Sequence, residues 1–430
     1  MQHFIPQFLF VSRLCRLSLH LDIFRLARQI FHSYYSPHPS PMATIRALWL
    51  LATACAAATS RRSQDHITIP LMQHRGENAD ANAQTLHAYI RHSQPRSSFA
   101  TAPELQDAGT GFWYGTFSIG SSTNLSLLID TASSDVAINP GLYKPSSHSE
   151  NLHQTGHLQY ATTQADGCGY ADIKYHTYSD TVSLAGLTAS NQVFAEVINS
   201  TPPNPQTVTV FRHDGLVGFG GTLASQTQLG GTPFLQQLCD EGVVKECRFG
   251  LAYGTQGRGK QILGGVDISL FDGKLAFSPI NPGATVGITG DVVYKNEHGS
   301  GKLKSQVLVL DSGTANVVGP ASQVRKLFKD LGIQTVKQKN EACSSVVYGH
   351  YACDSPAKVG FAVGRQVFNI EPSAFKLADN GGNNCTATIT AVDDFAFWIV
   401  GQSWFQGKYV DFQQPNKIGA ASLKNKTLAE

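Results

Sequence analysis

Apolar runs separated by turn-forming residues fill the chain from about residue 110 onward. The runs are alternating or continuously apolar, and Gly, Asn, Asp and Ser end them. Short strands joined by tight turns produce this spacing, so the pattern predicts an all-β body with few helices. The runs are FWYGTFSIG (112–120), LSLLIDTAS (125–133), DTVSLAGL (180–187), NQVFAEVI (191–198), KQILGGVD (260–267), QVLVLDSG (306–313), KVGFAVGRQVFNI (358–370) and FWIVGQSWF (397–405).

Two segments follow helical spacing instead. Thr232–Cys239 opens on a Thr–Pro pair, which favours the start of a helix. Pro320–Leu331 has apolar residues at helical intervals and stops before Gly332. We expect one helix in each segment.

The body contains a faint internal repeat built around two aspartates. An apolar run leads into Asp130-Thr-Ala-Ser and is followed later by Leu-Val-Gly, which ends at Gly218. A second apolar run leads into Asp311-Ser-Gly-Thr and is followed by Ile-Val-Gly, which ends at Gly401. The repeat predicts a duplicated β domain, with Asp130 in an N-terminal lobe (101–285) and Asp311 in a C-terminal lobe (286–430).

Two such aspartates define a recognisable chemistry. Carboxylates held within about 3 Å of each other cannot both ionise, so they share one proton. The charged member deprotonates a water, and the protonated member polarises a substrate carbonyl and then protonates the leaving amine. This chemistry needs no metal, cofactor or covalent intermediate, and we expect none.

The residues beside each aspartate suit supporting roles. The hydroxyls of Ser133 and Thr314 are placed to hydrogen-bond the carboxylates, and those of Thr131 and Ser312 to tie the two loops together. Gly313 completes the second loop. One Asp–Ser/Thr–Gly motif alone is usually a plain turn. Two copies at matching places favour the functional interpretation.

From about Gly111 to Leu423 the sequence resembles the pepsin-like aspartic endopeptidases. The resemblance implies a two-lobed fold with a central cleft and a β-hairpin flap over the substrate. The matching stretches are YGTFSIG (114–120), DTASSD (130–135), SDTV (179–182), DGLVGFG (214–220), LGGVD (263–267), DSGTANVVGP (311–320), FWIVG (397–401) and YVDFQQPNKIGAA (409–421).

The body contains six of the eight cysteines, none with zinc-ligand spacing. The resemblance implies a disulfide between Cys353 and Cys385. Cys239 and Cys247 are a reasonable local pair. The pairing of Cys168 and Cys343 stays open.

The sequence departs from the family at three main places. Ala132 replaces the usual Gly after Asp-Thr, which costs roughly 1–2 kcal/mol if the backbone there needs a positive φ. Ala137 replaces a Trp that pairs with a flap tyrosine. Counting back from Asp180 places Cys168, followed by Gly169 and Tyr170, at the flap position. The change of Asp to Gln402 is a fourth, milder difference.

These departures leave two functions open. The first is an active endopeptidase working at acidic pH. The alternative is a catalytically impaired homologue that acts as a peptide- or inhibitor-binding protein. Carboxylates within hydrogen-bonding distance favour the first, and a flap collapsed into the cleft favours the second.

The leader indicates secretion. Residues 42–60 combine Arg46 with a continuous apolar run and small residues, which is typical of a signal peptide too short to span a bilayer. We interpret residues 1–41 as a gene-model extension, with a signal-anchor or organelle presequence as the alternative. By the resemblance, residues 61–100 are a propeptide of uncertain boundary.

Charge and sequons refine the picture. Residues 1–100 hold ten Arg, no Lys and four acids, leaving 23 bases and 27 acids in 101–430. This mildly acidic body excludes the concentrated basic surface that binds nucleic acids.

We expect a soluble, secreted or vacuolar monomer without a membrane anchor, acting on polypeptides and binding its own propeptide. The glycosylation candidates are Asn124, Asn199, Asn384 and Asn425.

Overall fold

The computed structural model describes most of the body and one segment upstream of it. All described residues belong to one compact unit, Gln64–Glu430. The predictions for residues 1–41 and 42–60, and for most of 61–100, lie outside them. The described residues are 67–72, 112–162, 164, 166–201, 211, 213–221, 228–340, 343–392 and 395–428, without the side chains of 67–72, 199–201, 340, 343 and 344.

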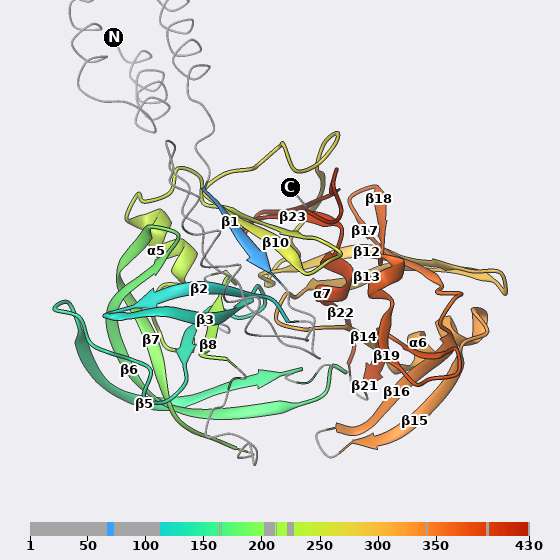
Figure 1. The fold of residues 1–430 in the computed structure, drawn as a ribbon, viewed down its shortest axis with the longest axis horizontal. Coiled ribbons are helices and arrows are strands. Elements are labelled where there is room, and N and C mark those ends of the chain that lie inside the picture. The colour runs from blue at the N-terminus through green and yellow to red at the C-terminus, as the bar shows by residue number, and fades with distance from the viewer. Residues whose placement is uncertain are drawn as a thin grey trace, which may run out of the picture. The chain divides into compact units, whose positions relative to one another are not determined.

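Among the described residues, thirteen strands form a first sheet, in the order β11-β24-β23-β9-β10-β1-β2-β3-β8-β4-β7-β6-β5 (Figure 1). They are β1 (Ile67–Met72), β2 (Tyr114–Ile119), β3 (Ser122–Asp130), β4 (Val136–Ile138), β5 (Glu150–Ala161), β6 (Tyr170–Leu184), β7 (Leu187–Thr201), β8 (Gly215–Gly218), β9 (Phe249–Tyr253), β10 (Arg258–Leu263), β11 (Ala276–Pro279), β23 (Lys408–Gln413) and β24 (Lys417–Ser422).

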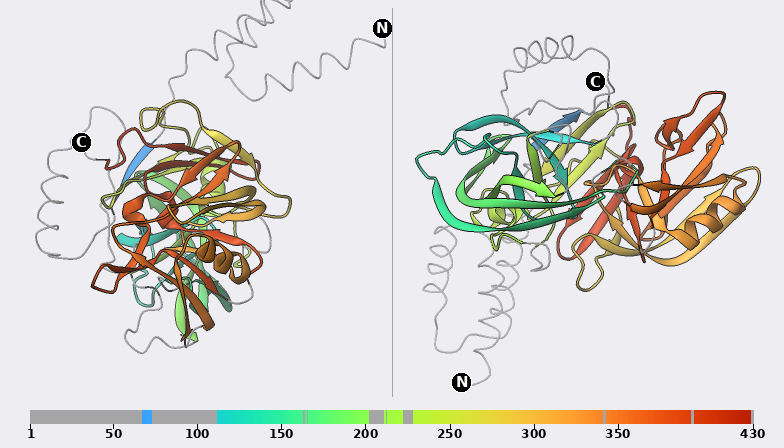
Figure 2. Two further views of the ribbon diagram at one scale, coloured as in Figure 1. Left: turned by 90° about the vertical axis from the view of Figure 1, so that its right-hand side faces the viewer. Right: turned by 90° about the horizontal axis from the view of Figure 1, so that it is seen from below.

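Eleven further strands of the described chain form a second sheet, in the order β18-β17-β12-β13-β22-β14-β21-β16-β20-β19, with β15 paired to β16. In Figure 1 and in the right-hand view of Figure 2, the green strands of the first sheet and the orange strands of the second lie on opposite sides of the body. The strands are β12 (Gly287–Lys295), β13 (Ser300–Leu310), β14 (Val317–Pro320), β15 (Gln334–Asn340), β16 (Cys343–Ala352), β17 (Lys358–Val363), β18 (Gln366–Asn369), β19 (Lys376–Asp379), β20 (Asn384–Ala387), β21 (Ile389–Val392) and β22 (Trp398–Val400).

Helices are short in the described part of the chain. The two predicted helices are present as α5 (Phe234–Asp240) and α6 (Ala321–Asp330), each preceded by a proline. Helix α6 buries Val324, Leu327 and Phe328, the stripe that its helical spacing predicts. The remaining helical elements are α7 (Gln402–Phe405) and a 3-10 turn, Pro372–Ala374. No helix among these residues has the length and apolar character needed to cross a membrane.

The internal repeat corresponds to two equivalent strand arrangements. Strand β3, which ends at Asp130, pairs in parallel with β8, and β8 pairs antiparallel with β4. Strand β13, which leads into Asp311, pairs in parallel with β22, and β22 pairs antiparallel with β14. The two Leu/Ile-Val-Gly runs of the sequence are therefore the central strands of these triplets, and each triplet presents one aspartate at its strand end.

The predicted lobe boundary at residue 285 falls between β11 and β12. The C-terminal strands β23 and β24, assigned by sequence to the second lobe, pair instead with β9 and β11 of the first sheet. Strand β1, from the predicted propeptide, pairs antiparallel with β10 of the same sheet. The first sheet is thus built from three distant parts of the chain, which periodicity alone does not predict.

Candidate active site

The two repeat aspartates meet at the centre of the molecule. Asp130 ends β3, whose inward residues Leu125, Leu127 and Ile129 are buried at the alternate positions expected of a strand. Asp311 follows directly after β13. Each aspartate is only 6% exposed, and the two carboxyl groups hydrogen-bond each other. The structure therefore brings the predicted pair together.

Each carboxylate is held by its own loop in the same way. The Ala132 backbone N–H donates to Asp130 Oδ1 at 2.9 Å, and the Ser133 hydroxyl donates to Asp130 Oδ2 at 2.5 Å. In the second loop, the Gly313 backbone N–H donates to Asp311 Oδ1 at 2.7 Å. The Thr314 hydroxyl donates to Asp311 Oδ2 at 2.6 Å. The two loops are thus chemically equivalent around their carboxylates.

Four reciprocal hydrogen bonds tie the two loops together. The Thr131 hydroxyl donates to the Leu310 carbonyl at 2.8 Å, and the Ser312 hydroxyl donates to the Ile129 carbonyl at 2.6 Å. In return, the backbone N–H groups of Thr131 and Ser312 donate to the opposite hydroxyls, at 3.1 and 2.9 Å. Both side chains are fully buried, so they fix the separation of the aspartates.

Burial dominates the electrostatics of the pair. It raises the pKa of Asp130, against the hydrogen bonds from Ser133 and Ala132. Burial also raises the pKa of Asp311, and the negative charge of Asp130 raises it further, against the hydrogen bonds from Thr314 and Gly313. The two carboxyls therefore retain a proton at a pH where an exposed aspartate is fully ionised.

Asp135, five residues after Asp130, is a further buried carboxyl on this side of the site. It accepts hydrogen bonds from the backbone N–H groups of Gln228 and Leu229, at 2.7 and 3.3 Å. Burial nevertheless raises its pKa to about 6. Asp135 therefore fixes the loop after residue 228 and titrates near neutral pH.

The departures from the family pattern are accommodated locally. Ala132 is not one of the described non-glycine residues with positive φ, so its Cβ carries no backbone strain. Ala137 is fully buried in a cluster with Leu158 and Ile173. The Gln402 amide, also buried, donates to the Ser312 carbonyl.

The predicted flap is the hairpin of β5 and β6, whose turn lies between Ala161 and Tyr170 (Figure 1). The three flap candidates occupy different surroundings. Cys168 is 1% exposed and packs with Val318 and Val346 of the second sheet. Gly169 has φ +93°, which suits a turn glycine. Tyr170 is 47% exposed at the start of β6.

Two side chains that the sequence motifs do not single out, Thr162 and Tyr160, lie near the paired aspartates. Thr162, immediately after β5, hydrogen-bonds Thr314 at 2.7 Å. Tyr160 interacts electrostatically with Asp130, and burial raises its pKa. Thr162 lies outside the strand and has a positive φ, so strand alternation does not place its side chain. Counting back from Asp180 points to Cys168 instead, and the sequence gives no separate signal for Thr162.

The structure contains the Cys239–Cys247 and Cys353–Cys385 disulfides. Cys168 is also disulfide-bonded. The side chain of Cys343 lies outside the described residues, so the Cys168 pairing stays open. The sequon residues Asn124, Asn384 and Asn425 are exposed, and the side chain of Asn199 is not described.

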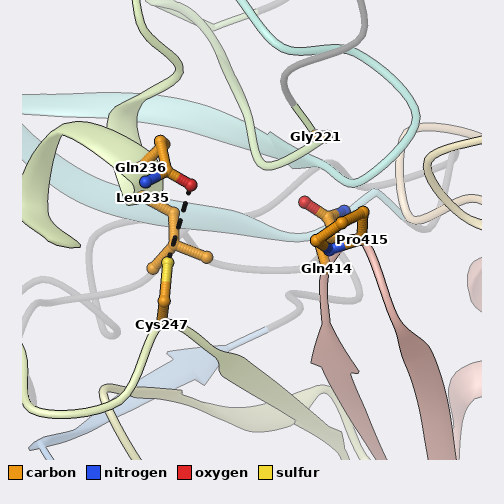
Figure 3. Close-up of a pocket in the computed structure, with 7 residues that line it drawn as sticks. Gly221, Leu235, Gln236, Cys247, Gln414 and Pro415 are labelled. Atoms are coloured by element: carbon orange, nitrogen blue, oxygen red, sulfur yellow. Dashed lines mark hydrogen bonds between the residues drawn. The ribbon is translucent and has the colours of Figure 1, made fainter. Parts of the chain in front are cut away.

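A separate pocket lies between α5 and the turn that joins β23 to β24 (Figure 3). The Sγ of Cys247 lies 3.8 Å from Oε1 of Gln236 at its edge. None of its described lining residues carries a carboxylate, so the pocket offers no acid–base pair. It is lined by Gly220, Gly221, Leu235, Gln236, Cys247, Gln414 and Pro415.

The sequence and the fold are similar to those of known aspartic proteases. A family model described as eukaryotic aspartyl protease matches residues 112–423. Pepsin A from Sus scrofa is 25% identical over 332 residues, covering 72% of this chain and 81% of pepsin A. Secreted aspartyl protease 1 from Malassezia globosa is 25% identical, covering 75% and 76% of the two chains. The crystal structure of aspartic proteinase from Irpex lacteus has the same fold, with a TM-score of 0.59, 19% identity and coverage of 74% and 96%.

Proposed function

Because the chain belongs to the eukaryotic aspartyl protease family, we propose that Asp130 and Asp311 carry its aspartic endopeptidase activity. The observation that carries this proposal is the pair of carboxyls, buried, hydrogen-bonded to each other and held by equivalent loops. The reciprocal bonds between Thr131 and Ser312 support it, because they fix the separation of the pair before substrate binds.

The proposed mechanism uses the one proton that the buried, coupled pair shares. In the starting state we place this proton on Asp311 and the negative charge on Asp130. Asp130 takes a proton from a water between the carboxyls, and the water oxygen bonds to the peptide carbonyl carbon. Asp311 donates its proton to the carbonyl oxygen. As the C–N bond breaks, Asp130 returns its proton to the amine, so the initially charged carboxyl rather than the initially protonated one protonates the leaving group. The diol proton passes back to Asp311.

The proposal extends to conditions and location. Loss of the shared proton ends this mechanism, so activity is expected at acidic pH. The apolar run of residues 42–60 and the likeness to a secreted aspartyl protease support secretion. The pairing of β1 with β10 supports a propeptide that folds onto the body. The substrates are polypeptides, and the enzyme acts as a monomer.

The second candidate is a peptide-binding protein without turnover. One observation favours it: Thr162 beside the hairpin turn contacts Thr314, which directly supports Asp311. A turn that stays there restricts the space above the carboxyls. The two candidates differ in whether the hairpin opens.

Proteolysis of denatured haemoglobin or casein across pH 2–7 tests the proposal. The propeptide-free protein is assayed with and without pepstatin, beside an Asp311→Asn variant as matched control. We expect acidic, pepstatin-sensitive cleavage that the variant lacks. Absence of cleavage by folded wild-type protein at every pH, with pepstatin still bound, would instead establish the binding protein.

A further inference from the structure

A chain of hydrogen bonds runs from the hairpin to the second aspartate. The Thr162 and Thr314 hydroxyl oxygens are 2.7 Å apart, and the Thr314 hydroxyl donates to Asp311 Oδ2 at 2.6 Å. A hydroxyl carries one proton. Because Thr314 gives its proton to Asp311, Thr162 must be the donor in the bond between the two threonines. Thr162 and Thr314 are 6% and 0% exposed, so little water competes for these bonds.

The backbone of Thr162 is strained at this point. Its φ is +55°, in the left-handed region that a β-branched residue rarely adopts. Such a conformation persists only where surrounding contacts impose it, and it is most common at functional sites. The contacts that impose it here come from the second sheet.

The turn after Thr162 is anchored on strands of the second lobe. The Tyr348 hydroxyl donates to Asp166 Oδ2 at 2.6 Å, and the Thr390 hydroxyl donates to the Asp166 carbonyl at 2.7 Å. A Cβ added at Gly167 would clash with the Val318 side chain, so the backbone approaches β14 very closely. With Cys168 buried beside Val318, this anchor holds the turn against the lobe that carries Asp311.

We propose that Thr162 is a positioning residue for the catalytic pair, acting through Thr314 on Asp311, and that the anchored turn delivers it. The proposal rests on the proposed endopeptidase function. Donation from Thr162 polarises the Thr314 hydroxyl and strengthens its bond to Asp311. The hairpin is therefore coupled to the second aspartate, and the end of β5 rather than the turn at Cys168 supplies the coupling residue.

In the described part of the chain, the other ionisable groups near Asp311 are one carboxyl and two tyrosines. Asp130 from β3 faces Asp311 directly. Tyr253 from β9 interacts electrostatically with Asp130, and Tyr160 from β5 interacts with Asp130 and Asp135. Both tyrosines have a pKa raised by burial and stay neutral in the working range. Removal of the Thr162 hydroxyl therefore changes the support of Asp311 without changing any charge.

The test compares Thr162→Val, which removes the hydroxyl but keeps the shape, with Thr162→Ser, which keeps the hydroxyl. Thr155→Val, at an exposed position of β5, the strand that leads into Thr162, is the matched control. We expect Thr162→Val to lower kcat/KM about five-fold, the size of one neutral hydrogen bond, and to move the alkaline limb of its pH profile upward. Thr162→Ser should restore both. An unmoved limb, or a serine variant as impaired as the valine variant, overturns the proposal.

An assay without turnover separates this test from the proposed function. Carbon-13 NMR titration of labelled aspartate carboxyls reads Asp311 directly, with its resonance assigned by the Asp311→Asn variant. We expect the titration midpoint of Asp311 to rise in Thr162→Val and to stay at the wild-type value in Thr162→Ser. An unchanged midpoint in the valine variant overturns the coupling. Wild-type protein that does not cleave overturns the endopeptidase proposal instead.

Discussion

The carboxyl group of Asp130 lies directly against the Cα of Gly313. A Cβ built at Gly313 would lie 2.5 Å from Oδ1 and 2.6 Å from Cγ of Asp130. Real Cβ atoms do not make such contacts, so the second loop needs glycine for the approach of the first aspartate. Ala132, the equivalent residue of the first loop, already carries a Cβ. The two loops of the repeat therefore differ in how closely each approaches the opposite carboxyl.

Substitution of Gly313 by Ala should disable the site without unfolding the protein. The added methyl displaces Asp130 by about 1 Å, and a misplacement of this size costs about 100-fold in rate. The reverse exchange in the first loop, Ala132→Gly, should keep the rate of peptide hydrolysis within about three-fold of wild type, because the Ala132 backbone is unstrained. Peptide hydrolysis by both variants checks this. Equal losses in the two would show that the loops are equivalent after all.

The sequence indicated the aspartates and their loops because that information is local and repeated. Each aspartate ends an apolar run, and Thr131 and Ser312 occupy matching places beside them. The hairpin turn is different. Its position depends on bonds from Asp166 to Tyr348 and Thr390, which are 182 and 224 residues away along the chain. No periodicity near residue 166 encodes such partners, so the sequence predicts Cys168 over the cleft and gives no signal for Thr162.

Loss of the Tyr348 hydroxyl should loosen the hairpin turn. Tyr348→Phe removes the 2.6 Å bond to Asp166 and leaves that carboxylate oxygen without this donor. A hydrogen bond to a charged group contributes about 1.5–3 kcal/mol, so amide exchange in the turn should accelerate at least ten-fold. Hydrogen exchange followed by mass spectrometry measures it. Tyr170→Phe, exposed in the same hairpin, is the control and should leave exchange unchanged.

If amide exchange in the turn is the same in Tyr348→Phe and wild type, the remaining contacts of Gly167 and Cys168 hold the turn by themselves. The Asp166–Tyr348 bond would then follow from the turn position instead of fixing it.

Asp135 should make the folded state more stable as the pH falls. Burial raises its pKa to about 6 in the folded protein, whereas an exposed aspartate has a pKa of about 3.9. The folded state therefore binds the proton more tightly. This contribution is full below about pH 4 and is lost as the pH rises through 6, a change of about 2–3 kcal/mol.

Asn at position 135 cannot ionise, so Asp135→Asn should remove this part of the pH dependence. Urea unfolding at pH 4 and pH 7 measures it, and the pH difference in unfolding free energy should be smaller in the variant by about 2 kcal/mol. The aspartate pair contributes equally to both proteins and cancels in the comparison. Identical pH differences would mean that Asp135 is hydrated in the folded protein and titrates normally.

Lys408 is a buried cation that should destabilise the folded protein in acid. It is 2% exposed on β23, its Nζ donates to the Gln406 carbonyl at 2.9 Å, and it lies 5.5 Å from the Trp404 ring centre. Burial lowers its pKa to about 7, with Glu371 opposing this shift and Lys426 adding to it. The unfolded chain binds the proton more tightly. Stability is therefore lost as the pH falls from about 10.4 to 7, and the loss persists below 7.

Substitution of Lys408 by Met keeps the unbranched shape and removes the charge. We expect Lys408→Met to raise the unfolding free energy by about 2–4 kcal/mol at pH 5 and by about half as much at pH 9. Lys417→Met is the matched control, since Lys417 also lies over an aromatic ring, at 4.4 Å from Phe277, but is partly exposed. It should change stability by less than about 0.5 kcal/mol. A Lys408→Met variant that is less stable than wild type at pH 5 would show that the bonds of the ammonium group outweigh its desolvation.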